Sequence, residues 1–536
     1  MVESSQSLEL LESLGLIAPS TRPPVPGDGP QTTAGVLAPA LAATPDAPAL
    51  IGASGRYTFA ELDREVDRAA NALRALGVVA GDRVAVCLPN DVDIVVHFLA
   101  SQRLAAMWVG IQRPLAPKEK AYMLADCGAR LFVADPETLV PVLALGAALP
   151  ELEHTLSLED WRERVRAASS QRVGVGVAVD PFAPAAIAYT SGTSGRPKGA
   201  VHSQHNLLLA AAMLVLTGAQ PHVRVGVVLS LTLLNMIVRA VLSAYYGGRT
   251  LVCIERHDPA AIAAWVKREQ IGSLDLVPAL VRDLLSSPDV GDDLASLEDI
   301  VSGGGACPPD VLELYRKRFG RGVAVGYGMT EAPTGVARSR GEPAPAPGYC
   351  GVAIAQVELR VVDEHGDVLP PGEVGELCVA PATTGEYAGC YTPMLGYWGK
   401  PEATREALRD GCYHTGDLGL IDEAGRVFIR GRRSELIVRG GSNVYPAEVE
   451  RVLEEHPEVA GAAVLGVDDE RLGERVVAAV ERVAGARVDA EALRRHAAES
   501  LARYKVPDRI AIVEALPRNA LHKVLKRELK PLFEDS

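Results

Sequence analysis

The chain has 536 residues, which is too long for one hydrophobic core, so we expect two or three structural units. Its 54 Lys and Arg residues against 68 Asp and Glu give a net charge of −14, which argues against a nucleic-acid surface or an anionic membrane as the main partner. None of the eight cysteines lies in a Cys-x-x-Cys pair, so neither a zinc site nor a disulfide framework is expected, and a cytoplasmic location is favoured. The N-terminus lacks a basic signal-peptide region, and no apolar run is long enough for a membrane span.

Helical and strand patterns alternate along the first part of the chain. Residues 1–35, which contain many Pro, Gly and Ser, are predicted to be a loosely held lead-in. Thr58 and Glu61 have the spacing of a helix capping box, and the apolar residues that follow recur at steps of three and four. This helix is followed by predicted strands at 84–88, 107–110 and 130–134, which alternate with helices at 93–105 and 117–127. Such alternation indicates a parallel sheet with both faces covered by helices.

Residues 189–199 read Tyr-Thr-Ser-Gly-Thr-Ser-Gly-Arg-Pro-Lys-Gly and follow an apolar run that predicts a buried strand. An amphipathic helix is predicted after His205, so the loop is expected between a strand and a helix. Glycines let backbone N–H groups converge, hydroxyls add donors, and Lys198 adds a positive charge, all of which suit a phosphate. A plain surface loop is the alternative, and the Walker A pattern is absent because Gly199 follows Lys198. The candidate nucleotide-binding residues here are Thr190, Ser191, Gly192, Thr193, Ser194, Gly195 and Lys198.

A second candidate site lies at residues 326–331, Gly-Tyr-Gly-Met-Thr-Glu, which contain an aromatic ring, a hydroxyl and a carboxylate. Tyr327 could stack on a purine, Thr330 could reach a phosphate oxygen, and Glu331 could hold Mg²⁺. The alternative is a strand that ends in a capped turn. Short alternating runs at 360–376 then predict a small antiparallel region.

The sequence Thr-Gly-Asp at 415–417 places a carboxylate, which only accepts hydrogen bonds, after a glycine. A lone Asp in this position is usually a turn residue. A new pattern of helices and strands begins after Gly431, so we predict a domain boundary at about Ser434. In this terminal domain, helices are expected at 446–455 and 489–502, and strands at 462–467 and 476–480. The basic segment at 516–526 contains Lys523, although charge runs near a terminus are mostly solvated.

These motifs, in this order, resemble those of the adenylate-forming superfamily, which contains acyl-CoA synthetases, adenylation domains of peptide synthetases, and luciferases. The resemblance covers nearly the whole chain after about residue 35. It implies an α/β fold: a large N-terminal domain at 36–433, with doubly wound sheets, helices and a small antiparallel region, and a small mobile α+β domain at 434–536. The implied catalytic residues are Thr190, Glu331 and Lys523, with Mg²⁺ on Glu331. The implied nucleotide-binding residues outside the loop are Gly304, Gly305, Ala306, Tyr327, Gly328, Thr330, Asp417 and Arg432.

Two positions depart from the family pattern. His522 stands where the family usually has Gly, and Ser434 stands at the hinge, where the family usually has Asp or Lys. Gly440 and Gly441 resemble the glycines that line the tunnel for the pantetheine thiol of coenzyme A, and glycine permits that close approach. The acyl pocket is expected around Leu233, Leu234, Asn235 and Met236, for which core packing is the alternative.

The resemblance implies an AMP-forming acyl-CoA synthetase, which uses ATP, Mg²⁺ and coenzyme A. The leucines near 233 favour an apolar monocarboxylic acid of medium-chain, alicyclic or aryl type, and no counterpart of the Asp that binds an amino group is found there. One alternative is an enzyme that loads the acyl group onto the phosphopantetheine thiol of a carrier protein. Another is a catalytically silent nucleotide-binding module. No nucleic-acid partner is expected, and a homodimer is left open.

Overall fold

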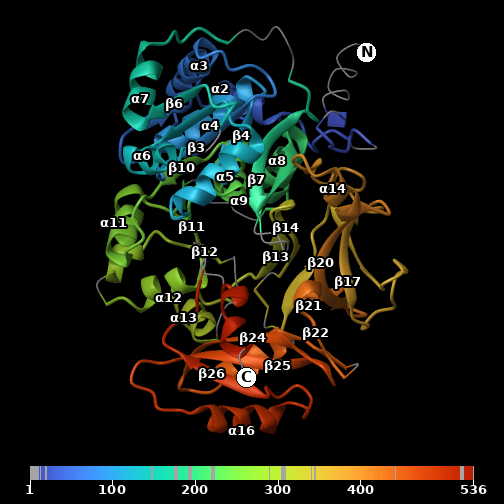
Figure 1. Cartoon of the computed structure of the whole chain (residues 1–536). Coiled ribbons are helices and arrows are strands. Elements are labelled where there is room, and N and C mark those ends of the chain that lie inside the picture. Colours follow the sequence, from blue (N-terminus) through green and yellow to red (C-terminus); the bar gives the residue numbers. More distant parts are fainter. Residues whose placement is uncertain are drawn as a thin grey trace. The chain divides into compact units, whose positions relative to one another are not determined.

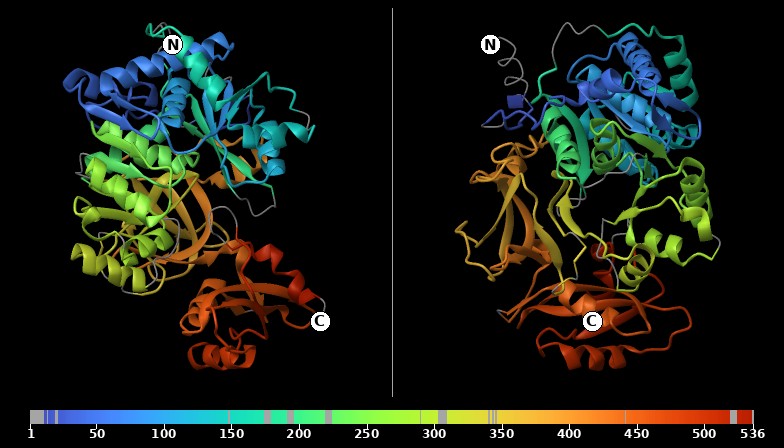
Figure 2. Two further views of the ribbon diagram at one scale, coloured as in Figure 1. Left: turned by 90° about the vertical axis from the view of Figure 1, so that its left-hand side faces the viewer. Right: turned by 180° about the vertical axis from the view of Figure 1, so that it is seen from behind.

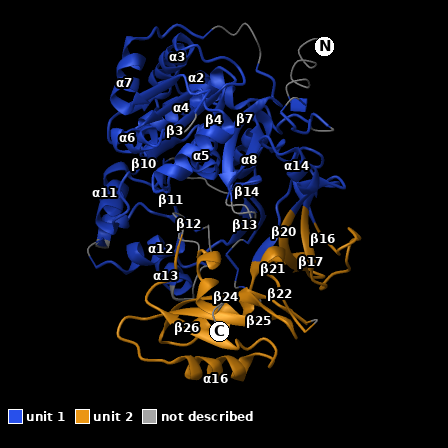
Figure 3. Ribbon diagram, viewed as in Figure 1, with its two compact units in different colours: residues 1–345, 350–359, 379–414 blue, residues 346–349, 360–378, 415–536 orange. Residues whose placement is uncertain are grey.

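The computed structural model describes residues 11–12, 14–18, 21–146, 149–173, 179–190, 196–218, 224–288, 290–302, 309–339, 341–342, 344, 346–440, 442–518 and 524–534. The chain forms two compact units (Figure 3). The first contains residues 1–345, 350–359 and 379–414, and the second contains residues 346–349, 360–378 and 415–536. The predicted domain boundary at Ser434 lies within the second unit. It stays a prediction, because it concerns which part of the chain moves, whereas the two units are defined by compact packing.

One sheet of the first unit has seven strands in the order β18-β8-β7-β4-β3-β5-β6. The parallel neighbours are β7 (Pro184–Thr190), β4 (Met107–Gly110), β3 (Arg83–Cys87), β5 (Leu131–Ala134) and β6 (His154–Ser157). The antiparallel edge consists of β8 (Lys198–Ser203) and β18 (Gly396–Tyr397). All four residues of β5 are buried, as expected for a strand covered on both faces.

The other sheet of this unit has six strands in the order β12-β11-β9-β10-β1-β2. These are β12 (Asp299–Ser302), β11 (Ser273–Leu276), β9 (Arg224–Val227), β10 (Thr250–Cys253), β1 (Pro48–Ile51) and β2 (Arg56–Thr58). All neighbours are parallel except β1 and β2. The predicted doubly wound α/β architecture is therefore confirmed.

Helices cover these sheets, and the longest begins with the predicted capping box. Glu61 N donates to Thr58 Oγ1, and Thr58 N donates to Glu61 Oε2. Helix α3 lies beside α4 and α7, whereas α12 lies beside α11 and α13, as Figures 1 and 2 show. The longer helices are α3 (Phe59–Ala75), α4 (Val92–Arg103), α5 (Pro117–Cys127), α6 (Pro136–Ala144), α7 (Leu158–Ala167), α8 (Gln204–Leu216), α11 (Pro259–Glu269), α12 (Pro278–Ser286) and α13 (Pro309–Phe319). The shorter ones are η1 (Thr33–Gly35), α2 (Ala38–Ala43), α9 (Leu234–Met236), the π-helix η2 (Ile237–Leu242), α10 (Ser243–Tyr246), η3 (Gly291–Leu294) and α14 (Pro401–Ala407).

Antiparallel strands follow, as predicted for the middle of the chain. In the first unit, β13 (Gly326–Met329) pairs with β14 (Ala332–Arg338), and β14 pairs with β15 (Tyr349–Ala353). The strand β20 (Cys412–Ile421), which belongs to the second unit from Thr415 onward, forms a hairpin with β21 (Arg426–Arg432). The remaining strands of this region are β16 (Val357–Val362), β17 (Gly375–Pro381) and β19 (Leu408–Arg409).

The terminal part of the second unit is an α+β fold, as predicted. Its sheet runs β23 (Ser442–Val444), β22 (Ile437–Arg439), β25 (Gly473–Arg482) and β24 (Val459–Asp469), with β26 (Arg509–Val513) parallel to β25. One face packs on α15 (Pro446–Glu454) and α16 (Ala490–Ser500). The other face packs on Leu516, Leu529 and Phe533. The short helices are η4 (Arg433–Glu435), η5 (Lys526–Glu528) and α17 (Pro531–Glu534).

The helix predicted after His205 is present as α8, but its predicted amphipathic character is wrong. It is buried on nearly every side from Gln204 to Met213. A helix whose residues from Leu207 to Leu216 are all apolar belongs in a protein core. Among the residues that the structure describes, no helix is both long and apolar enough to cross a membrane.

Candidate active site

The phosphate-binding loop predicted at 190–198 joins two antiparallel strands. Tyr189 pairs with Gly199, and Thr190 pairs with Lys198, so β7 and β8 form a hairpin. The predicted strand before the loop and the predicted helix after it are both present, and the buried residues directly after Lys198 form one further strand, β8, between the loop and α8. Thr190 and Lys198 stand at the two ends of the turn, while Ser191, Gly192, Thr193, Ser194 and Gly195 lie outside the described residues.

Helix α5 holds both ends of this hairpin loop. On one side, the Tyr189 hydroxyl donates to Asp126 Oδ2 at 2.8 Å. On the other, the Tyr122 hydroxyl lies 3.1 Å from the carbonyl oxygen of Pro197 and 3.3 Å from Asp126 Oδ1. Burial, helped by the neighbouring Cys127 and Asp126, raises the pKa of Tyr189, so its phenol stays a hydrogen-bond donor. Asp126 and Tyr122 thus anchor the described ends of the loop, a role that the sequence analysis missed.

Lys198 and Glu331, which are far apart in the sequence, meet at one aromatic ring. The Tyr397 hydroxyl donates to Glu331 Oε1 at 2.9 Å, and Lys198 Nζ lies 5.2 Å from the centre of the Tyr397 ring. Tyr397 belongs to β18, whose pairing with β8 places it beside the loop. The Tyr413 phenol also hydrogen-bonds to Tyr397, and burial raises its pKa well above the usual value, with Glu331 adding to the rise. The sequence analysis missed Tyr397, for which the available signal is an aromatic pair between two glycines at 396–399.

His202 ties the strand after the loop to the second motif. Its Nε2 is 2.8 Å from the carbonyl oxygen of Thr330, and its Nδ1 is 2.6 Å from Asn206 Oδ1. Burial lowers the pKa of His202 to about 4, although both hydrogen bonds oppose this shift. His202 is therefore neutral near pH 7, and its single N–H, on Nε2, donates to the carbonyl oxygen of Thr330 and holds that backbone in place. Its signal in the sequence is a polar side chain inside a buried strand.

The Tyr327–Glu331 motif forms β13 and the turn into β14. A side chain at Gly328 would place its Cβ 2.4 Å from Gly335 Cα, so only glycine permits this approach of the two strands. Tyr327 and Thr330 are both partly exposed, as groups that contact a ligand must be. The predicted companions Gly304, Gly305 and Ala306 lie outside the described residues.

The segment expected to line the acyl pocket lies against the same strand. Helix α9 packs on β14, which begins directly after Glu331. Leu234 and Met236 are buried, whereas Leu233 and Asn235 are partly exposed. Asn235 Oδ1 is buried without a hydrogen-bond partner in the part of the chain that the structure describes. This segment therefore contains both packed core residues and residues that a substrate could reach.

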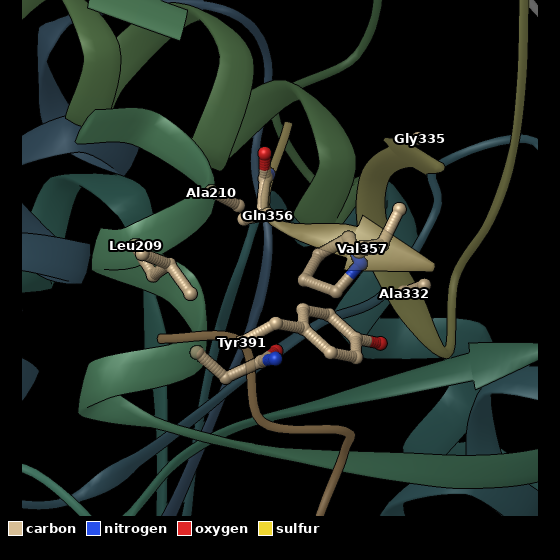
Figure 4. Close-up of a pocket in the computed structure, with 9 residues that line it drawn as sticks. Leu209, Ala210, Ala332, Gly335, Gln356, Val357 and Tyr391 are labelled. Carbon is tan, nitrogen blue, oxygen red and sulfur yellow. The ribbon is translucent and has the colours of Figure 1, made fainter. Parts of the chain in front are cut away.

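A small pocket opens beside Ala332, the first residue of β14. Figure 4 shows Leu209 and Ala210 of α8, which line the pocket together with Tyr391, Gln356 and Val357. The pocket contains none of the four residues predicted for the acyl group. It lies on the side of β14 that faces α8, so we do not assign it to the substrate.

In the second unit, Asp417 and Arg432 face each other across the hairpin of β20 and β21. Arg432 Nε is 2.6 Å from Asp417 Oδ1, and Asp417 is almost fully buried. Thr415 Oγ1 donates to the carbonyl oxygen of Leu377 and accepts from the N–H of Asp417. A buried Glu376 binds the N–H of Gly416 at 3.0 Å and Arg433 at 3.2 Å. The structure thus brings together the two residues predicted for ribose and adds Glu376, which the sequence analysis did not include.

The predicted hinge and thiol residues follow directly. Ser434 is exposed within η4. Gly440 has φ +57°, a conformation that favours glycine, and its N–H donates to the carbonyl oxygen of Leu472 at 2.7 Å. Gly441, His522 and Lys523 lie outside the described residues.

No group of three or more His, Cys, Asp or Glu residues that could hold a metal ion is found among the residues that the structure describes. Cys87, Cys127, Cys253 and Cys390 are buried free thiols.

Comparison with known proteins agrees with this geometry. A family model described as "AMP-binding enzyme" matches residues 37–398, and one described as "AMP-binding enzyme C-terminal domain" matches residues 448–523. Feruloyl-CoA synthase from Amycolatopsis sp is 34% identical over 493 residues, which cover 91% of this chain and 96% of that protein. The fatty acid–[acyl-carrier-protein] ligase ScoC from Streptomyces coeruleorubidus is 33% identical over 503 residues, which cover 91% and 94% of the two chains.

Among solved structures, ATP-bound MatB from Rhodopseudomonas palustris superposes with a TM-score of 0.83 at 30% identity, covering 94% of this chain and 99% of that one. The ordered motifs, the fold and both family models therefore lead to the same result. The chain belongs to the AMP-binding enzyme family, within the adenylate-forming superfamily, and is a ligase.

Proposed function

We propose that this enzyme binds ATP and joins a carboxylic acid to a thiol in two half-reactions. In the first, the carboxylate attacks the α-phosphate of ATP, and pyrophosphate leaves as the acyl-adenylate forms. In the second, the thiol of coenzyme A attacks the acyl carbon, and AMP leaves. The observation that supports this most is Tyr397, which holds Glu331 by a hydrogen bond while its ring lies near Lys198.

The first half-reaction brings two anions together, so charge neutralisation is the main task of the site. Lys198 and the loop from Thr190 would bind the polyphosphate, and Thr330 would contact the α-phosphate. Tyr327 would stack on adenine, and Asp417, paired with Arg432, would accept hydrogen bonds from the ribose hydroxyls. We propose that the ammonium group of Lys523 contacts both the substrate carboxylate and the α-phosphate and neutralises part of their charge. The other residues proposed to bind the nucleotide are Ser191, Gly192, Thr193, Ser194, Gly195, Gly304, Gly305, Ala306 and Gly328.

Glu331 fits Mg²⁺ as a ligand, because Mg²⁺ prefers carboxylate oxygens and is usually held by one or two carboxylates together with substrate phosphates. The hydrogen bond from Tyr397 orients this carboxylate. When bound, Mg²⁺ would neutralise charge on the phosphates. The protein's own part is to hold the Glu331 carboxylate beside the phosphate loop.

For the second half-reaction, we propose that the domain after Ser434 rotates, withdraws Lys523, and presents a thiol channel lined by Gly440 and Gly441. The positive φ of Gly440 supports a specific need for glycine at this position. Such a rotation would separate the two steps in time.

We propose an apolar monocarboxylic acid as the substrate, of medium-chain, alicyclic or aryl type. Leu233, Leu234 and Met236, with Asn235, lie on the segment next to β14 and are mostly apolar. The similarity to a feruloyl-CoA synthase favours the aryl type and coenzyme A as the acceptor. The similarity to ScoC favours a second candidate, in which the acceptor is the phosphopantetheine thiol of an acyl carrier protein.

The deciding measurement is AMP and pyrophosphate release with ATP, Mg²⁺ and a panel of octanoic, cyclohexanecarboxylic, benzoic and ferulic acids. Each acid is tested alone, with coenzyme A, and with a phosphopantetheinylated acyl carrier protein. AMP release that rises with coenzyme A supports the first proposal, and AMP release that rises only with the carrier protein supports the second. No pyrophosphate from any acid of these three types would contradict the proposed substrate class.

Lys523→Ala tests the assignment of the two half-reactions. We expect this change to abolish pyrophosphate release and to leave thioester formation from a supplied acyl-adenylate close to that of the unmodified enzyme. Equal loss of both half-reactions would contradict the role given to Lys523.

A further inference from the structure

In the second unit, Lys526 lies between two carboxylates. Its Nζ is 2.8 Å from Glu435 Oε2 and 2.8 Å from Glu450 Oε1. Glu435 ends η4, directly after Ser434, and Glu450 belongs to α15. Glu450 also accepts a hydrogen bond from the N–H of Val464 in β24 at 2.8 Å, which anchors it to the sheet. The lysine therefore joins the predicted hinge to the body of the terminal domain.

Lys526 also stands next to the base of the loop that contains Lys523. Arg518 and Val524 form an antiparallel bridge, and the N–H of Leu525 donates to the carbonyl oxygen of Pro517 at 2.8 Å. These contacts pair the residues on either side of positions 519–523, and Lys526 is the next residue along the chain. Lys526 thus provides a direct ionic contact between the residues that flank Lys523 and the hinge, in addition to the apolar packing of Leu516 on the sheet.

The charges favour this arrangement. Burial by itself would lower the pKa of Lys526, but the carboxylates of Glu450 and Glu435 outweigh it and raise that pKa, so the ammonium stays charged. The side chains of Lys526 and Glu450 are 22% and 19% exposed, and such partly buried pairs are screened less than surface pairs. Without the lysine, two carboxylates would face each other, and repulsion would separate the hinge from α15.

We propose that Lys526 is a positioning residue for the adenylation step. By holding Glu435 and Glu450 together, Lys526 makes the hinge and the residues that flank Lys523 move as one rigid body. The rotation about Ser434 then determines the position that Lys523 reaches for the adenylation step. This inference rests on the proposed function, since it concerns the step assigned to Lys523. Loss of these contacts should therefore slow adenylation, which needs Lys523, and leave thioester formation, which does not need it, unchanged.

The test compares Lys526→Met, which removes the charge, with Lys526→Arg, which keeps it. For Lys526→Met we expect single-turnover pyrophosphate release to fall about 10- to 100-fold, as misplacement by about 1 Å can cause. Thioester formation from a supplied acyl-adenylate should change less than about twofold, and Lys526→Arg should recover most of the loss. Equal slowing of both half-reactions, or unchanged pyrophosphate release, would overturn the proposal.

The matched control is Lys505→Met, which breaks another ion pair with α15, between Lys505 and Glu448 at 2.7 Å. It should leave both half-reactions unchanged. A double variant of Glu435→Gln and Lys526→Met should lose less than the product of the single effects, because both changes break the same contact. Additive losses would contradict the coupling.

Amide hydrogen exchange on the full-length protein gives a readout that needs no substrate. In Lys526→Met, exchange should accelerate both at residues 433–436 and at 516–518 with 524–526, and it should not do so in Lys505→Met. Unchanged exchange in both segments overturns the proposal, whatever the activity. If exchange is faster in both segments but the protein releases no pyrophosphate with any acid, the result supports the link made by Lys526 and contradicts the proposed function instead.

Discussion

Replacing Tyr397 by phenylalanine removes one hydroxyl and leaves the aromatic ring in place. That hydroxyl donates to Glu331 Oε1 at 2.9 Å. A hydrogen bond to a charged group contributes about 1.5–3 kcal/mol. Because Glu331 is partly exposed, we take the lower end, about 1.5 kcal/mol, which corresponds to roughly a tenfold change in rate or affinity. The loss concerns the orientation of the carboxylate that we assign to Mg²⁺.

The assay is single-turnover pyrophosphate release across a Mg²⁺ titration. For Tyr397→Phe we expect the rate at limiting Mg²⁺ to fall about tenfold and to recover partly when Mg²⁺ is saturating. Tyr397→Leu also removes the ring that lies 5.2 Å from Lys198 Nζ, so its rate should be lower again. That cation–π contact is worth roughly 0.5–2 kcal/mol.

Tyr391→Phe is the matched control, because the Tyr391 hydroxyl is buried without a hydrogen-bond partner among the described residues. Its loss should leave the Mg²⁺ dependence as it is. A Tyr397→Phe enzyme with the Mg²⁺ dependence of the unmodified protein would refute the link between this hydroxyl and the metal ligand.

Three further outcomes are expected. Asp417→Asn removes the charge that faces Arg432, so ATP affinity should fall about tenfold in a calorimetric titration, and unchanged affinity would argue against contact with ribose. Tyr122→Phe removes the hydroxyl at Pro197, which should raise the KM for ATP roughly fivefold with little effect on kcat, and a change confined to kcat would contradict loop anchoring. The neutral form of His202 is stabilised by folding, so its contribution is complete above its ordinary pKa of 6.5 and is lost as the pH falls towards about 4. At pH 5 the loss should be about 2 kcal/mol in denaturant unfolding, and His202→Asn should weaken this dependence on pH.

The local structure of several elements could be predicted to the residue. Helix α5 spans Pro117–Cys127 and strand β4 spans Met107–Gly110, both as expected from the sequence. In α5, Pro117 has its φ preset for the first helical position, and Gly128 takes the left-handed conformation that ends a helix, with φ +60°. These signals lie within a few residues of the structure that they determine.

Other features depend on contacts that no short segment contains. The hairpin of β7 and β8 forms because β8 has a partner on each side, β7 and β18, and the second of these comes from near residue 396. Helix α8 is buried over most of its length by the elements around it, although its apolar residues from Leu207 to Leu216 already favoured a core position. The sequence analysis therefore missed the strand β8 and misjudged the environment of α8 while identifying the residues in them.

The sequence by itself determined the class of protein and most of the candidate residues, because the motifs around Thr190, Tyr327 and Asp417 consist of neighbours along the chain. Only the tertiary structure decided which side chains from elsewhere in the chain contact and orient these candidate residues. Tyr397 reaches Glu331 across 66 residues, and His202 reaches Thr330 across 128. Such partners are separated by many elements whose packing sets the distance between them, so their pairing arises only when the sheets assemble.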